Sequence, residues 1–148
     1  MTKLYYAALT CLVAGLASGF FYREFTKAND FTGDSQLSLV HTHLLALGML
    51  FFLLVLALEK LFDLSSTGLL TPFFWVYSAG LAVTVSTMIA NGVITVTGGT
   101  SSPAIAGISG LGHILITTAL GILFVALGRQ VRAHAREALS SERAPRSS

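Results

Sequence analysis

Three histidines lie within the apolar part of this chain, and a neutral imidazole is the commonest metal ligand among side chains. His41 and His43 are separated by one residue at the start of one long apolar run, and His113 lies inside another. An imidazole in hydrocarbon has no hydrogen-bonding partner unless the protein supplies one, so an ionisable residue there usually has a function. These histidines therefore predict a site for a metal ion or a haem.

The composition predicts the elements that must position them. The chain has 148 residues, of which 53% are hydrophobic and only 11% are charged, whereas soluble domains carry about 25% charged residues. Four apolar segments each reach the roughly 20 residues that a transmembrane helix needs, and they lie at about 4–25, 37–58, 72–96 and 103–127. None alternates as the strands of a membrane β-barrel do. We expect an all-α integral membrane protein with four transmembrane helices.

The basic residues predict the topology. Seven fall on one side of the expected membrane: Lys3, Lys60, Arg129, Arg132, Arg136, Arg143 and Arg146. Only Arg23 and Lys27 fall on the other. Because basic residues accumulate on the cytoplasmic side, we expect both termini in the cytoplasm.

The chain then divides into a transmembrane domain, residues 1–128, and a basic cytoplasmic tail, residues 129–148, that is partly disordered. We expect a multi-pass protein of the prokaryotic cytoplasmic (inner) membrane in contact with lipid. No motif or basic aromatic surface indicates binding to nucleic acid.

This topology brings the histidines to a similar depth. His41 and His43 lie one to two turns below the outer start of the second helix, and His113 lies roughly 15 Å into the fourth, at 1.5 Å per residue. Residues two apart on a helix diverge by about 200° and share no face. One of the paired histidines would therefore face lipid in a single four-helix bundle. We expect a homo-oligomer, most simply a trimer, in which it faces a neighbouring subunit.

Haem fits these histidines better than a bare ion does. A tetrapyrrole needs one or two axial imidazoles and a flat apolar slot, and the single cysteine, Cys11, excludes a thiolate cluster. Gly110 lies one turn before His113 and leaves room for a planar ring. Arg23, at the outer end of the first helix, is placed to pair with haem propionates, or equally with Glu24 or lipid. Interhelical hydrogen bonding, worth about 1 kcal/mol, would explain one histidine, but three at one depth favour a haem-iron site.

Small residues on the first helix recur at four-residue spacing, at Ala7, Cys11, Gly15 and Gly19. This ridge predicts close helix packing, either within a subunit or between subunits.

Helix starts and the charges near helix ends can also be predicted. Thr71 is expected to cap the third helix, and Ser101 and Ser102 to open the fourth. Glu59 and Asp63 are expected to be interfacial or capping charges rather than catalytic carboxylates.

Residues 20–27, 36–49 and 108–115 resemble an uncharacterised family of short four-helix prokaryotic membrane proteins with a His-Thr-His-Leu-Leu-Ala-Leu-Gly motif, here residues 41–48. The likeness covers nearly the whole chain up to the Arg-rich tail. It implies the four-helix fold but no activity.

The pair His41 and His43 also resembles an element of the catalytic subunit of haem–copper oxidases and nitric-oxide reductases. That subunit is in effect three four-helix arcs, and one of its helices carries a His-x-His whose imidazoles face two haems. The resemblance implies haem binding and a homotrimer. The chain has none of that family's copper-site or proton-channel motifs, so it does not imply oxygen chemistry.

Our leading hypothesis is a haem-b-binding membrane protein that acts in electron transfer, with a redox partner still to be identified, or as a redox- or gas-responsive haem carrier. We expect a cofactor carrier rather than an enzyme. Two alternatives remain open: a copper or proton transporter that uses the membrane histidines, and a cofactor-free assembly subunit of a respiratory complex.

Overall fold

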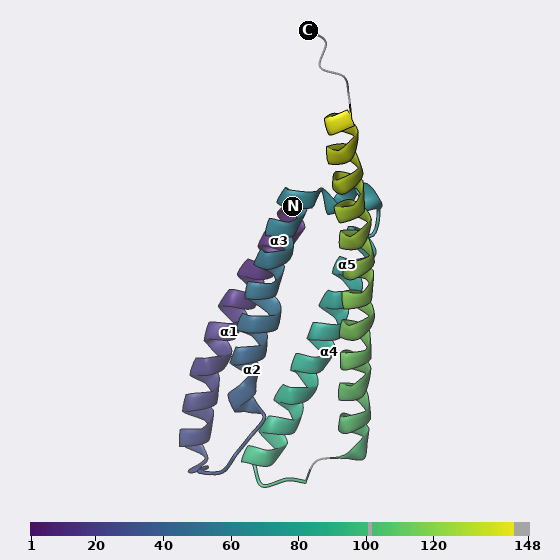
Figure 1. Ribbon diagram of the computed structural model, residues 1–148. Coiled ribbons are helices and arrows are strands. Elements are labelled where there is room, and N and C mark those ends of the chain that lie inside the picture. Colours follow the sequence, from purple (N-terminus) through teal and green to yellow (C-terminus); the bar gives the residue numbers. More distant parts are fainter. Residues whose placement is uncertain (101, 144–148) are drawn as a thin grey trace.

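The computed structural model describes the chain except Ser101 and residues 144–148, and the described part is helical throughout, with connecting turns. Four spans are long and apolar enough to cross a membrane. They are α1 (Thr2–Ala28), the composite second span, α4 (Leu70–Val96) and α5 (Pro103–Arg143) (Figure 1). The second span joins α2 (Leu37–His43), η1 (Leu44–Leu50) and α3 (Phe51–Phe62), and a short 3₁₀ turn, η2 (Leu64–Thr67), follows it. The predicted all-α fold with four apolar spans is confirmed.

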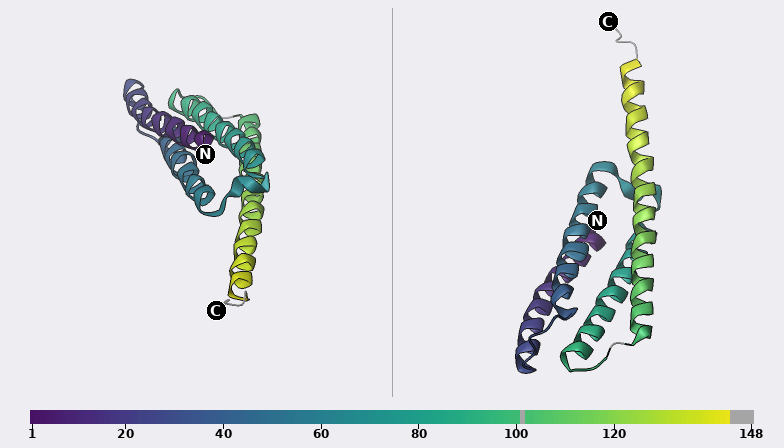
Figure 2. Two further views of the ribbon diagram at one scale, coloured as in Figure 1. Left: turned by 90° about the horizontal axis from the view of Figure 1, so that it is seen from above. Right: turned by 60° about the horizontal axis from the view of Figure 1, so that its bottom comes forward.

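The helices run up and down, so the start of α1 and the last described turns of α5 lie at the same end of the molecule (Figure 1). Contacts follow the chain: α1 packs on the second span, α2 packs on α4, and α4 packs along α5. Seen from above, the helices form an open arrangement, with α1 and α5 toward opposite sides (Figure 2). α5 extends past the other helices at the end where α1 starts (Figures 1 and 2).

The small-residue ridge of α1 packs inside the subunit, against the second span. A Cβ added to Gly48 would lie 2.6 Å from the Cβ of Cys11, and one added to Gly15 would lie 2.8 Å from Leu45 Cδ2. Real side chains do not approach so closely, so the glycines set the separation of these helices. Of the two roles expected for the ridge, the structure shows the internal one.

A second close approach fixes the rotation of α5 against α4. A Cβ on Gly80 would lie 2.9 Å from the backbone nitrogen of Ile116, and one on Gly112 would lie 3.0 Å from the backbone nitrogen of Thr84. Ala119 and Leu123 continue this seam as buried residues. Because Gly112 faces α4, the next residue, His113, is turned to the flank of that contact.

The second span is not a continuous α-helix. η1 is a π-helix that begins directly after His43, and the wider turn changes which side chains face each neighbour. The hydroxyl of Tyr77 on α4 donates a 2.8 Å hydrogen bond to the carbonyl of Leu47 within it. Tyr77 is buried and stacks on Phe51, with 4.6 Å between ring centroids. The apolar periodicity of the sequence did not reveal this π segment.

The start of α4 differs from the prediction. Thr71 is not its N-cap, because the helix begins at Leu70 with Leu69 as the capping residue. The turn before α4 ends ahead of Thr71, so the helix can start at Leu70. In this turn Gly68 adopts φ 71°, and the hydroxyl of Thr67 accepts the Leu69 N–H at 3.2 Å.

The start of α5 agrees with the prediction in its described part. The helix begins at Pro103, and the hydroxyl of Ser102 accepts the N–H of Ala104 at 3.2 Å. Ser101, expected to act there too, lies outside the described residues.

The carboxylates at the end of α3 have a structural role, as expected. Glu59 is only 6% exposed, and its Oε2 accepts the backbone N–H of Ser65 at 2.9 Å. Asp63 Oδ1 accepts the Ser65 hydroxyl at 3.0 Å. Both carboxylates therefore hold the turn into η2.

Candidate functional site

His41 lies at the contact between α2 and α1. A Cβ added to Gly19 would lie 3.7 Å from His41 Cβ, which is ordinary contact. The ring Nδ1 is buried without a hydrogen-bond partner among the described residues, and Nε2 lies 3.3 Å from the Thr42 hydroxyl. The backbone therefore does not fix the orientation of this imidazole.

His43 has a different environment. Its Nδ1 lies 3.0 Å from the carbonyl oxygen of Leu39, four residues earlier on α2. In the tautomer with a proton on Nδ1, that N–H donates to the carbonyl and Nε2 carries the free lone pair. Since α2 is a regular helix through His43, this side chain diverges from His41 by about 200° and points away from α1.

His113 repeats the geometry of His43. Its Nδ1 lies 2.9 Å from the carbonyl oxygen of Ser109, four residues earlier on α5, and the residue is exposed. A Cβ added to Gly107 or Gly110 would find nothing within 4 Å. The space beside the α5 backbone at these two glycines is therefore open in the described structure.

The structure places His43 and His113 on separate helices, with α4 packed between α2 and α5. Both lie in the half of their spans nearest the loops at residues 29–36 and 97–102. Among the described residues, no three His, Cys, Asp or Glu side chains converge in a way that could hold a metal ion. The described part of the chain therefore gives no support to a bare ion held by three of its side chains.

The backbone partners of the imidazoles were not anticipated from the sequence. The acceptors are the carbonyls of Leu39 and Ser109, and every helical histidine has such a carbonyl four residues before it. His134, on the α5 extension, makes the same bond, 2.9 Å to the carbonyl of Gln130. Its ring lies edge-on to Phe62 with centroids 6.0 Å apart. The backbone bond alone therefore does not mark a ligand, and position within an apolar span is also needed.

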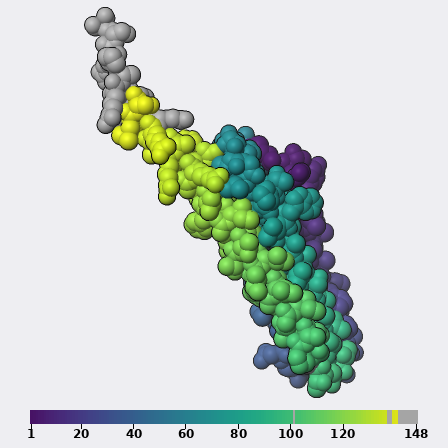
Figure 3. Space-filling view, turned by 90° about the vertical axis from the view of Figure 1, so that its right-hand side faces the viewer, coloured from purple at the N-terminus to yellow at the C-terminus, as the bar shows by residue number. Residues whose placement is uncertain are grey.

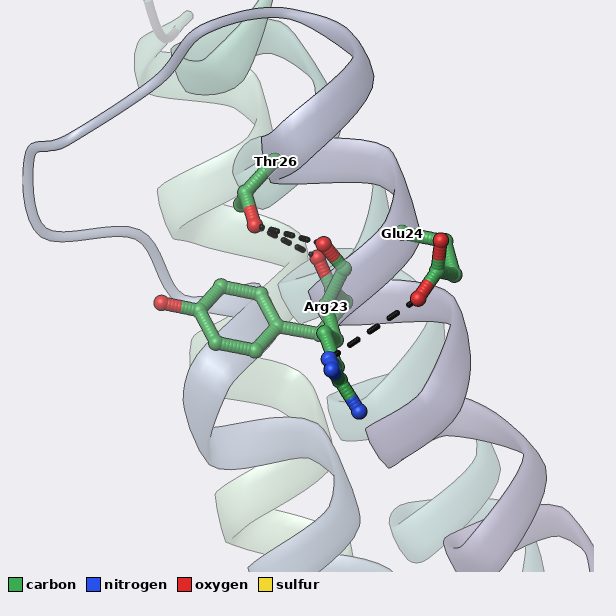
Figure 4. Close-up of polar contacts among 4 residues, drawn as sticks. Arg23, Glu24 and Thr26 are labelled. Carbon is green, nitrogen blue, oxygen red and sulfur yellow. Dashed lines mark hydrogen bonds and ion pairs between the residues drawn. The ribbon is translucent and has the colours of Figure 1, made fainter.

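Arg23 lies near the loop end of α1, beside Glu24 (Figure 4). Its Nε is 3.8 Å from Glu24 Oε1, and the two side chains are 81% and 48% exposed. The Thr26 hydroxyl donates to the carbonyls of Tyr22 and Arg23 at 2.9 and 3.1 Å (Figure 4). An ion pair this exposed adds little stability, so the guanidinium can exchange Glu24 for another anion.

The described side chains meet the requirements of a haem in two respects. His43 and His113 can each present an Nε2 lone pair from a ring held by its own backbone, as metal-binding histidines commonly do. The α5 backbone around Gly107 and Gly110 is open beside one of them.

A family model described as "Protein of unknown function (DUF2871)" matches residues 1–130. No curated protein and no solved structure matches the chain. The matched region includes all three histidines of the apolar spans, and the family description carries no activity.

Proposed function

We propose that this chain, which belongs to the DUF2871 family, binds haem b through His43 and His113 and acts in electron transfer or as a redox- or gas-responsive haem carrier. The observation that carries the proposal is a combination: both imidazoles lie in the apolar runs of their helices, and both make a hydrogen bond from Nδ1 to the carbonyl four residues earlier. The bond holds each ring in one tautomer and leaves Nε2 for a ligand.

The backbone bond also orients the ring nitrogen proposed as the ligand. Metal-binding histidines commonly donate their second N–H to a carbonyl, which fixes the tautomer and the direction of the ring. If both His43 and His113 held the haem, it would serve electron transfer, whereas a haem held by one of them could also bind a diatomic gas. Replacing the histidines singly distinguishes these cases.

We assign His41 a packing role rather than a ligand role. Its ring is held against α1 at Gly19, and its Nδ1 has no backbone partner in the described structure. The alternative pair, His41 with His113, would require an imidazole whose tautomer no hydrogen bond fixes.

The assembly we propose is a homotrimer in which His113 lies at a subunit boundary. His113 is exposed along an apolar span, where contact with lipid would cost up to a few kcal/mol, depending on depth. The α1 ridge is already used within the subunit, so the contact between subunits would involve other surfaces, such as the open part of α5 at Gly107 and Gly110.

Titration of haem-free protein tests this function. Protein purified from haem-starved cells should develop a Soret band as haemin is added, saturating at a fixed ratio of haem to chain. Parallel titration with copper tests the transporter alternative. Tight copper binding without haem binding would replace the proposed function.

A further inference from the structure

A groove runs along α5 where this helix leaves the other spans. It has a volume of about 370 Å³ and is lined by Phe124, Val125, Gly128, Arg129 and Arg132. α5 forms one outer face of the molecule, and its end projects beyond the remaining helices (Figure 3). The groove therefore lies where an apolar helix surface changes to a basic one.

The basic part of this surface consists of three arginines on one face of α5. Arg129, Arg132 and Arg136 follow each other at three and four residues, so at about 100° per residue they fall within roughly 60° of one another. All three are exposed, and no carboxylate among the described side chains pairs with them. Three adjacent guanidiniums repel each other, and an anion placed between them would relieve this repulsion.

The orientation of the basic face is fixed by the opposite side of α5. Gln130 Nε2 donates to the carbonyl of Asp63 at 2.9 Å and also contacts the Ser66 hydroxyl. These contacts join α5 to the turn after α3. The arginines therefore point away from the rest of the subunit.

In the apolar part of the groove, the backbone of α5 is not covered by side chains at its glycines. A Cβ added to Gly121 or Gly128 would find nothing within 4 Å. Beside these glycines, Phe124 is 71% exposed and Val125 is 51% exposed. This apolar part of the groove can therefore accommodate a hydrocarbon chain.

We propose that this groove binds an anionic phospholipid, with its phosphate between Arg129 and Arg132 and one acyl chain along Gly121, Val125 and Gly128. Guanidinium groups bind phosphate oxygens through paired N–H donors. A basic cluster directly after a membrane span is a typical site for acidic lipids. The continuous apolar floor favours a lipid over free phosphate, which needs only the charges. The site is independent of the histidines.

Lipid binding to the full-length protein in a neutral detergent tests this proposal. The probes are phosphatidylglycerol and phosphatidylcholine with the same acyl chains, and occupancy is measured by native mass spectrometry. The wild type should prefer phosphatidylglycerol. The double variant Arg129→Gln/Arg132→Gln should lose about thirtyfold in apparent affinity for it, because each basic residue near an anionic surface contributes about 1 kcal/mol.

Two further variants distinguish lipid binding in the groove from non-specific attraction between the protein's positive charges and the lipid. Lys60→Gln removes one exposed positive charge at the end of α3, outside the groove, and should leave the lipid preference unchanged. Gly128→Leu keeps both arginines but fills the floor, and should also weaken phosphatidylglycerol binding.

Three results would overturn the proposal. These are an unchanged preference in both groove variants, an equal loss in Lys60→Gln, and full displacement of the lipid by millimolar inorganic phosphate. The last would identify a phosphate site instead. If the double arginine variant does not fold, the Gly128→Leu result decides.

Discussion

A histidine in an apolar helix must place two ring nitrogens where water is scarce. His43 and His113 each satisfy one nitrogen with a carbonyl of their own helix, at 3.0 and 2.9 Å. That carbonyl belongs to the preceding turn and has a second lone pair available beside its helical bond. The second nitrogen, Nε2, is left without a described partner, which would be costly in hydrocarbon. We propose that a bond from Nε2 to haem iron offsets this cost.

Single alanine replacements test this assignment. His43→Ala and His113→Ala should each lower the haem content per protein several-fold, because each removes an oriented axial nitrogen. His41→Ala should retain haem, since that ring packs on α1. The measurement is the pyridine haemochrome spectrum normalised to protein concentration.

His134→Ala is the matched control. It removes an imidazole with the same backbone hydrogen bond, from the arginine-rich end of α5 after the apolar run at 103–127, and should leave the haem content unchanged. Full haem retention in both His43→Ala and His113→Ala would refute the ligand assignment. Loss in His41→Ala in place of His43→Ala would transfer the ligand role to the other member of the pair.

At the scale of elements, the π-helix η1 lies between His43 and Phe51, the residue that stacks on Tyr77 of α4. In a π-helix the hydrogen bonds run to i+5, and such segments often occur at functional sites. The Tyr77 hydroxyl satisfies the Leu47 carbonyl within it, while Gly48 lets α1 approach at Cys11. Both contacts stabilise the widened turn directly after His43.

Tyr77→Phe should therefore destabilise the protein modestly, by about 0.5–1.5 kcal/mol, the usual net value of one hydrogen bond. The thermal unfolding midpoint in detergent is the measurement. Tyr5→Phe is a suitable control, because Tyr5 is 51% exposed, whereas Tyr77 is buried. Equal midpoints for Tyr77→Phe and the wild type would show that the Leu47 contact does not stabilise η1.

The elements were largely predictable because their cause is local. Twenty apolar residues must form a helix in a bilayer, so the four spans follow from composition. The π segment did not follow, since it depends on the Tyr77 hydroxyl reaching Leu47 from a helix thirty positions away in the chain. Thr71 was misassigned for a similar reason, because the cap of α4 depends on the turn at Gly68.

The candidate site was predictable in its residue types but not in its contacts. Depth and charge distribution identified His41, His43 and His113 as a group. The distinction between His41 and His43 needed the packing of Gly19 and the bond to Leu39. Arg23 could be paired with an anion from sequence alone, but only the structure shows Glu24 in that position.

At the scale of the whole molecule, the open arrangement leaves much apolar surface to lipid or to other subunits. Exposed residues include Leu50 and Leu54 on the second span and Leu111 and Ile114 on α5. Lipid accepts such side chains at no cost, so they do not by themselves require a partner. The reason to expect a neighbouring subunit is His113, which is a polar side chain exposed on α5.

We therefore predict a homotrimer, measurable by native mass spectrometry in mild detergent. The trimer should carry haem. His113→Ala should weaken the assembly and lower the haem content, because we propose His113 both as a haem ligand and as a residue of the subunit boundary. Ile114→Ala, at an exposed neighbouring position, is the control and should preserve both. A haem-loaded monomer would contradict the subunit-boundary role of His113.

The most direct test of the central claim is the absorption spectrum of the full-length protein purified from cells supplied with a haem precursor. Haem binding through His43 and His113 predicts a Soret band in the oxidised protein and sharp α and β bands after reduction. A colourless protein, obtained folded and with its helices intact by circular dichroism, would contradict it.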